Sequence, residues 1–124
     1  MARRSKHAPC HDPLALHGVV LTHAHTDHLY GLPSLLHATW LLGRREPLSV
    51  YCDAETARQA RALCDVLGLF AKPRMFPVRW ISGAELEAPL PGRAVLRLFP
   101  VLHSVPTCGL AVAEARRRLV YSAD

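Results

Sequence analysis

The sequence predicts a mixed α/β (α+β) fold, with helices packed on a sheet. The prediction rests on the order of the hydrophobic patterns. A short β-branched apolar run over residues 16–21 is typical of a buried strand. An apolar helical repeat follows over 32–42, and a second strand and helix follow over 48–52 and 53–68. The pattern then alternates with a period of two, so the rest of the chain predicts strands.

Residues with strong positional preferences mark the ends of both predicted helices. Pro33 is tolerated in the first turn of a helix, and Gly43 is a suitable stop for the first one. Asp53 has the side chain of an N-cap, and Gly68 closes the second helix. The later strands are expected at 77–81, 85–88, 94–99, 109–113 and 119–122, with Arg116–Arg118 at the tip of the last hairpin.

Composition limits the chain to one folded domain. Its 124 residues are enough for one modest domain, and half of them are hydrophobic against one fifth charged. Residues 1–15 are polar and basic and predict a loose lead-in to a domain over 16–124. The net charge of +5 favours anionic partners, but much of the excess lies near the N-terminus and in Arg116–Arg118, where it reads more simply as solvated.

The cysteines and the hydrophobic runs predict a cytoplasmic protein that does not use a membrane. The four cysteines lie far apart and form no Cys-x-x-Cys pair, which does not resemble a secreted disulfide scaffold. Cys52 and Cys64 lie in apolar segments, where buried free thiols are common. The basic start lacks the apolar region of a signal peptide, and no apolar run reaches membrane-spanning length.

The most informative segment follows the first predicted strand and contains His23, His25, Asp27 and His28. Side chains alternate along an extended backbone, so His23 and His25 can point the same way. Asp27 and His28 can then reach a neighbouring position as the chain turns into a helix. Histidines in a row are also compatible with a surface cluster or an adventitious zinc site. The carboxyl end of a strand is where α/β proteins place their sites, which favours a functional metal site.

This motif resembles the signature of the metallo-β-lactamase-fold hydrolases. The fuller run Val20–Pro33 is most similar to the ribonuclease Z branch. The similarity continues through residues 99–109, which contain His103, and ends at 119–124, where Asp124 follows a predicted strand. The resemblance implies a sandwich of two sheets between helices, of which this chain would contain only a part.

The resemblance also implies six metal ligands, which are His23, His25, His103, Asp27, His28 and Asp124. The first three would hold one divalent ion, the next two would bind a second, and Asp124 would bridge both. The ions would be zinc, with manganese or iron as alternatives. Metal-bound hydroxide would then cleave a phosphodiester or related ester bond, and Asp27 would orient this hydroxide as the catalytic residue. The substrate would be an anionic ester, including RNA or a nucleotide.

Other polar residues near the motif have simpler interpretations. His37 is expected to be an ordinary, partly exposed helix residue. Thr22 is expected to support the motif loop by a hydrogen bond, and Ser104 and Thr107 to stabilise the loop after His103, with substrate contact as the alternative.

The chain departs from the family pattern at both ends. Complete members begin with a strand-rich half-sheet before the motif, and they continue past the bridging aspartate to a last histidine. We therefore expect a fragment that is incomplete on its own. Its uncovered apolar surface would be covered by a homodimer or by a missing complementary segment.

The interval between the last two predicted ligands bears on the substrate. Twenty residues separate His103 from Asp124, which is enough for a hairpin and too few for the RNA-gripping arm of transfer-RNA-processing members. This favours an armless phosphodiesterase relative. The alternative is a non-catalytic metal-binding fragment or half-domain that needs a complementary chain. A nucleic-acid-binding module is a third possibility, which rests on the basic charge alone.

Overall fold

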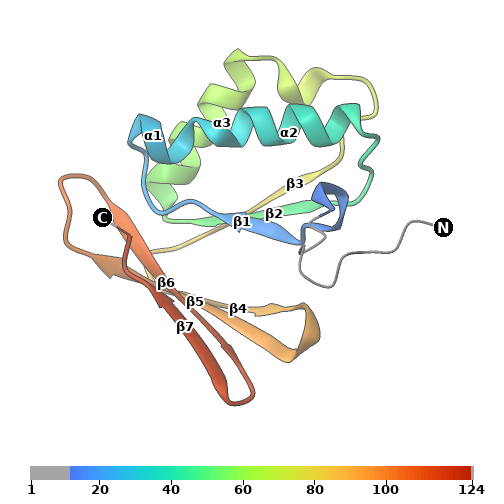
Figure 1. Cartoon of the computed structure of the whole chain (residues 1–124). Coiled ribbons are helices and arrows are strands. Elements are labelled where there is room, and N and C mark those ends of the chain that lie inside the picture. The colour runs from blue at the N-terminus through green and yellow to red at the C-terminus, as the bar shows by residue number, and fades with distance from the viewer. Residues whose placement is uncertain (1–11, 124) are drawn as a thin grey trace.

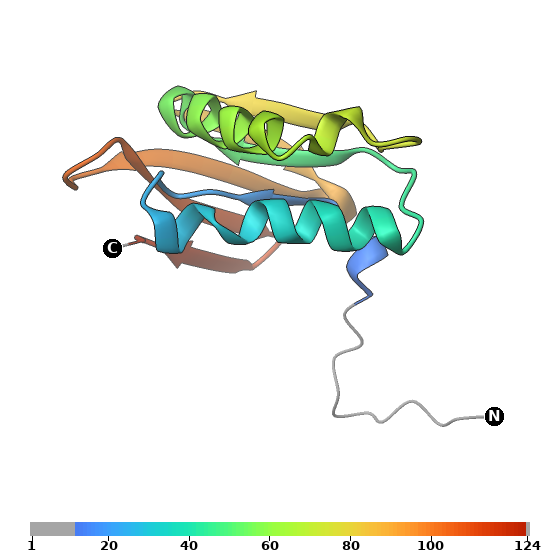
Figure 2. The ribbon, with the colours of Figure 1, turned by 90° about the horizontal axis from the view of Figure 1, so that it is seen from above.

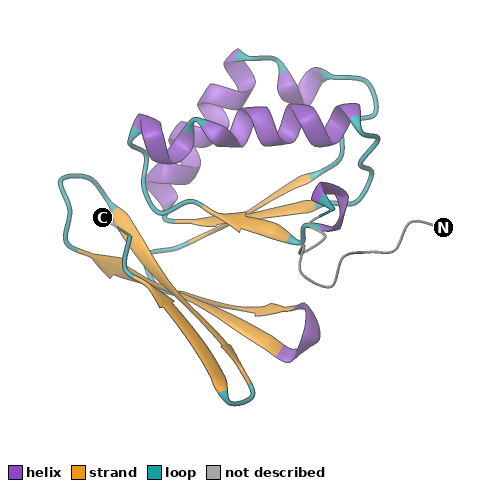
Figure 3. Ribbon diagram, in the orientation of Figure 1, coloured by secondary structure: helices purple, strands orange, loops and turns teal. Residues whose placement is uncertain are grey.

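The computed structural model describes residues 12–123, which form three layers (Figure 1). Helices cover one face of a parallel sheet, and an antiparallel sheet lies against its other face. The parallel strands thus form one sheet and the antiparallel strands form the other (Figure 3). The predicted lead-in falls mainly on residues 1–11, outside the described part. Residues Pro13–Ala15 form a 3₁₀ turn that the sequence analysis did not predict.

The parallel sheet has the order β1-β2-β3, formed by Gly18–Val20, Leu48–Cys52 and Val78–Ser82. All residues of the central strand β2 are buried, as expected for a strand covered on both faces. Val50 and Cys52 belong to the cluster beneath the helices, whereas Tyr51 belongs to the cluster between the two sheets. This alternation along β2 joins the two halves of the core.

Two helical segments, α1 (Thr26–Leu29) and α2 (Gly31–Leu41), follow β1, and α3 (Ala54–Val66) follows β2. Figure 2 shows α2 and α3 side by side over the parallel sheet. The buried face of α2 contains Leu32, Pro33, Leu36 and Thr39. The apolar helical repeat predicted over 32–42 is one residue too long, because Leu42 does not belong to the helix or to its buried face. This residue is the C-cap beyond the last turn of α2, and 58% of it is exposed.

The expected ends of the second helix are confirmed. The Asp53 carboxylate accepts hydrogen bonds from the Thr56 backbone N–H at 2.9 Å and from the Thr56 hydroxyl at 2.8 Å. This satisfies a backbone donor at the start of α3 that has no partner within the helix. Gly68 follows the helix with a φ of +69°, a left-handed conformation that costs glycine little.

The antiparallel sheet has the order β4-β5-β6-β7, formed by Leu86–Leu90, Ala94–Val101, Thr107–Glu114 and Arg117–Tyr121. Two short 3₁₀ turns, Leu69–Ala71 and Pro91–Arg93, precede β3 and β5. The predicted arginine tip is correct for Arg116 alone. Pairing begins at Glu114 and Arg117, so Arg117 and Arg118 belong to β7 rather than to the turn.

The last strand of this sheet leaves apolar side chains uncovered. Leu119, Val120 and Tyr121 in β7 are 63%, 57% and 49% exposed. This is the kind of uncovered surface that the sequence analysis expected of an incomplete sandwich. No helix within residues 12–123 is long and apolar enough to cross a membrane.

Arg44 follows α2 and links the chain at Leu14–Leu16 to the segment Glu46–Pro47 by hydrogen bonds. Only 4% of this residue is exposed, and its guanidinium donates hydrogen bonds to the carbonyl oxygens of Leu14, Leu16, Glu46 and Pro47. Burial lowers the pKa of the Arg44 guanidinium, an effect that the nearby charge of Glu46 opposes. An arginine nevertheless stays protonated at neutral pH, so the charge remains.

We expect Arg44→Ala to lower the free energy of unfolding by about 3 kcal/mol, because four partly buried carbonyl oxygens lose a charged donor. Urea unfolding monitored by circular dichroism measures the change. Arg45→Ala, at the exposed neighbouring position, is the matched control and should change stability by less than about 0.5 kcal/mol. Equal stability of the two variants would contradict this role for Arg44.

The cysteines of the described part are buried free thiols. Burial, with the charge of Asp53 adding to it, raises the pKa of Cys52 to about 12. Burial likewise raises the pKa of Cys64 to about 11 and that of Cys108 to about 11. The thiolate, which is the reactive form, is therefore scarce at neutral pH.

These three thiols should resist iodoacetamide at about pH 8 in the folded protein and react once the chain is unfolded in guanidinium. Peptide mass spectrometry of the alkylated protein distinguishes the positions. Rapid modification of any of the three under native conditions would show that the burial described above is wrong.

Candidate metal centre

The histidine motif lies where the two sheets meet. The Leu21 N–H donates to the Tyr51 carbonyl at 2.9 Å, which continues the pairing of β1 with β2. One residue later the Thr22 carbonyl accepts the Cys108 N–H of β6 at 2.8 Å, and the Cys108 thiol donates to the Leu21 carbonyl at 3.5 Å. The start of the motif is therefore attached to both sheets.

His23 is fully buried, and a neighbouring hydroxyl sets its ring orientation. The Thr22 hydroxyl oxygen lies 2.9 Å from His23 Nδ1. A hydrogen bond to one ring nitrogen fixes the imidazole so that the other nitrogen has a defined direction. The supporting role expected for Thr22 is therefore visible as a side-chain contact.

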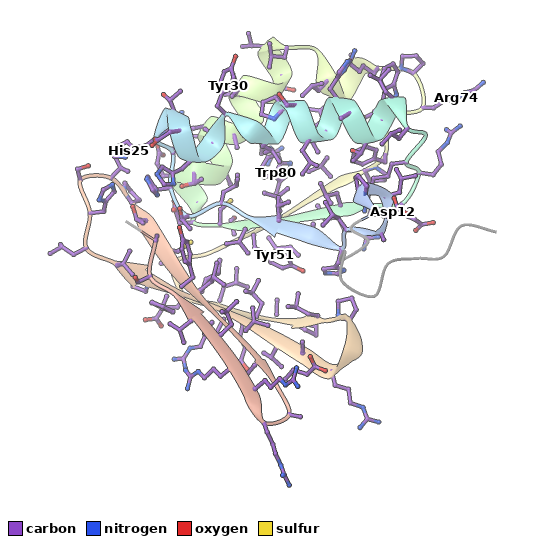
Figure 4. All side chains as sticks on the ribbon, viewed as in Figure 1. Asp12, His25, Tyr30, Tyr51, Arg74 and Trp80 are labelled. Carbon is purple, nitrogen blue, oxygen red and sulfur yellow. The ribbon has the colours of Figure 1, made fainter. Side chains whose placement is uncertain are left out.

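His103 meets the motif across 78 residues of sequence. It lies in the loop between β5 and β6, and its Nε2 is 3.2 Å from His25 Nδ1. The ring centroids of these two histidines are 4.9 Å apart, and that of His103 is 4.8 Å from that of His23. Figure 4 places His25 at the end of the fold where this loop approaches the helical layer.

The resulting cluster contains the three residues expected to hold a first metal. One ligand atom from each of His23, His25 and His103 lies within 4.8 Å of the others. Neutral imidazole is the ligand type that zinc, iron and related ions accept, so the donor set fits a divalent metal.

The two residues expected at a second metal lie beside this cluster. The turn of α1 begins with His28 and Leu29 N–H groups donating to the His25 carbonyl. This turn places the centroid of the His28 ring 4.0 Å from the centroid of the His23 ring. Asp27 Oδ2 is 3.4 Å from His28 Nε2, and the Asp27 side chain is 82% exposed. Asp124, the expected bridging ligand, lies outside the described residues.

The loop that carries His103 has its own internal support. The Thr107 hydroxyl donates to the Val105 carbonyl at 2.9 Å, in agreement with the loop-stabilising role expected for it. Ser104 Oγ lies 3.5 Å from His25 Nε2, so this side chain faces the cluster. His37 lies outside the cluster, exposed on α2 and stacked near Trp40, as an ordinary helix residue would be.

Sequence reasoning missed the structural role of Cys108. Its backbone N–H and its thiol both bond to the motif loop, and its sulfur is buried. The signal in the sequence is weak, because a cysteine in an apolar strand is usually an ordinary core residue. Only its position opposite the end of β1 gives it this function.

Comparison with known proteins decides the family. The profile of the beta-lactamase superfamily domain matches residues 1–124, the whole of the chain. The chain belongs to this superfamily. Its fold is the metallo-β-lactamase fold in part, and its similarity is to the ribonuclease Z branch, as the resemblance of the motif predicted.

Two curated relatives of this chain are both named ribonuclease Z. The chain is 35% identical over 118 residues to ribonuclease Z of Gemmatimonas aurantiaca, an alignment that covers 89% of this chain and 35% of the relative. It is 29% identical over 111 residues to ribonuclease Z of Methanococcus maripaludis, covering 85% of this chain and 34% of the relative.

Solved structures show the same fold. Human tRNase Z, short form, superposes with a TM-score of 0.70 at 18% identity, over 91% of this chain and 50% of that one. The metallo-beta-lactamase fold protein YhfI from Bacillus subtilis superposes with a TM-score of 0.66 at 19% identity, over 88% of this chain and 41% of that one. The chain thus spans about a third of the length of the curated relatives and about half of the solved structures.

Removing a ligand should weaken metal binding. We expect His25→Ala and His103→Ala each to weaken zinc affinity more than tenfold, and Thr22→Val to weaken it by about tenfold through loss of the His23 hydrogen bond. Competition with a chromophoric chelator measures the affinity. His37→Ala removes an exposed histidine outside the cluster and is the matched control. Unchanged affinity in both ligand variants would contradict the assignment.

Proposed function

We propose that this superfamily member is part of a metal-dependent hydrolase that cleaves phosphodiester bonds, with RNA as the substrate class. The observation that carries the proposal is the convergence of His23, His25 and His103 within 4.8 Å, from segments on two different sheets. The names of the ribonuclease Z relatives support the hydrolase class and the RNA substrate.

The chain's own residues would divide the work of such a site. His23, His25 and His103 would hold one divalent ion, and His28 with Asp27 would hold a second, completed by Asp124. We propose zinc, with manganese or iron as alternatives. When bound, the metal supplies a Lewis acid for the ester oxygen and an activated water. Thr22 would keep the His23 ring oriented through its 2.9 Å contact.

Asp27 is the residue we assign to proton and water positioning. Its carboxylate lies beside His28 and is 82% exposed, so that a substrate from solvent can approach it. A positioned carboxylate contributes to hydrolysis by accepting or orienting a proton of the attacking water. The exposure of this side chain also favours a large substrate over one enclosed in a deep cavity.

The interval after His103 supports an armless relative. Residues Thr107–Glu114 and Arg117–Tyr121 pair as one antiparallel hairpin, which takes up most of the interval of sequence between His103 and Asp124. We therefore propose phosphodiester cleavage on RNA or nucleotides and do not assign transfer-RNA 3′ processing. We also propose that a second copy or a complementary segment covers the exposed side chains of β7.

Hydrolysis of bis-p-nitrophenyl phosphate with added zinc or manganese tests the proposal. The protein is expressed together with any in-frame continuation of its gene. We expect His25→Ala and Asp27→Asn to lower kcat/KM by about 100-fold or more, because the first loses a metal ligand and the second loses the positioning carboxylate. His37→Ala should retain activity. Full turnover in both variants would reject the mechanism and favour a non-catalytic metal-binding domain.

A further inference from the structure

A second charged feature lies at the end of the helical layer opposite the histidine cluster. An open pocket of about 400 Å³ is lined by Trp40, Gly43, Arg44, Arg45, Pro73 and Arg74. Figure 4 shows Arg74 at the far end of the layer from His25. Three of the six lining residues are arginines and none is acidic, which is the composition of a site for an anion.

One of the lining residues, Arg44, is buried. Its guanidinium is hydrogen-bonded to the carbonyl oxygens of Leu14, Leu16, Glu46 and Pro47, none of which lines this pocket. The nearby charge of Glu46 also acts on it. The charges available to an anion in the pocket are therefore those of the two exposed lining arginines, Arg45 and Arg74.

Trp40 contacts the segment that precedes Arg74. The Trp40 indole N–H donates to the Pro73 carbonyl at 2.9 Å, and the Lys72 ammonium lies 4.6 Å from the centroid of the same ring. Arg74, two residues after Lys72, has a backbone φ of +59°, which is uncommon for a residue other than glycine. These contacts fix the segment 72–74 against the end of α2.

Arg45 and Arg74 are exposed and, among the described residues, take part in no ion pair. Arg58 on α3 shows the contrast, because its guanidinium is bonded to the Glu55 carboxylate. An exposed arginine that is already paired with a carboxylate has fewer free N–H donors and less net charge for binding an anion from solution. The pocket thus has two exposed guanidinium groups that take part in no ion pair within residues 12–123.

We propose that this pocket binds the phosphate backbone of single-stranded RNA. A guanidinium presents parallel N–H donors that match two phosphate oxygens, and two of them side by side can engage successive phosphates. The pocket is an open groove rather than an enclosed cavity, which suits a strand that passes through more than a nucleotide held at both ends. The net charge of +5 supports the same kind of partner.

The geometry also relates this groove to the metal centre. Residues 26–41 form two nearly collinear helices between them (Figure 1), so the two sites lie on the order of 24 Å apart at 1.5 Å per residue. Use of the groove as a substrate anchor rests on the proposed function, whereas RNA binding by the groove does not.

Fluorescence anisotropy with a labelled single-stranded RNA of about 20 nucleotides tests the inference. Binding is measured in EDTA over a range of salt concentrations, so the result is independent of any hydrolysis. The test variant is the double replacement Arg45→Gln and Arg74→Gln. Its matched control, Arg116→Gln with Arg118→Gln, removes the same charge from the β6–β7 hairpin.

We expect the test variant to weaken RNA binding about tenfold and to reduce the slope of log K against log salt by about 1.4, which is the loss of two phosphate contacts on a single strand. The control should change affinity less than about twofold. Equal effects of the two variants, or a larger effect of the control, would overturn the inference, because the binding would then follow total charge or the hairpin.

Two small probes distinguish a polynucleotide from a small anion. Inorganic phosphate and AMP are titrated against the same variants, and we expect both to bind far more weakly than the RNA. Arg45- and Arg74-dependent binding of either probe as tight as that of the RNA would also overturn the inference. Retained RNA binding by a protein that hydrolyses nothing would reject the proposed function and leave the groove assignment intact.

Discussion

The hydrogen bond from the Cys108 N–H to the Thr22 carbonyl, 2.8 Å long, is the contact on which the arrangement of the site depends. It joins the end of β1 in the parallel sheet to the start of β6 in the antiparallel sheet. His23 is the residue after one partner, and His103 lies five residues before the other. Together with the core cluster between the sheets, this attachment keeps imidazoles 80 residues apart in sequence in a common position. Both partners are buried, so the bond is costly to break.

Much of this arrangement could be predicted from the sequence, because local signals were strong. The range Leu48–Cys52 for β2 and the Asp53 cap of α3 followed directly from residue preferences. His103 was expected beside the motif through the resemblance, and its ring lies 3.2 Å from that of His25. The resemblance implied two sheets, but the strands that belong to each sheet and their order could not be predicted, because alternation along a strand does not reveal its neighbour. The carbonyl partners of Arg44 could not be predicted either, since they lie in a short turn and in irregular segments that packing brings together.

Two ends of one helical layer therefore have different chemistry. At the amino end of α1, imidazoles and a carboxylate gather over the edge where the sheets meet, and this end suits metal-assisted cleavage. At the carboxyl end of α2, Trp40 and three arginines line a pocket whose lining includes no acidic residue. A phosphodiester chain needs both kinds of contact, one to hold its backbone and one to cut it. Leu119, Val120 and Tyr121 of β7 are exposed apolar residues, and this face is where we propose that a second copy or a complementary segment packs.

The central claim is that the histidines from the two sheets share one metal ion. X-ray absorption at the zinc edge of protein loaded with one equivalent of zinc tests it most directly. The account predicts nitrogen and oxygen ligands at about 2.0–2.1 Å with the scattering pattern of three imidazoles. This pattern should weaken by one imidazole in His103→Ala. A shell of sulfur at about 2.3 Å, or a spectrum unchanged in His103→Ala, would contradict the claim.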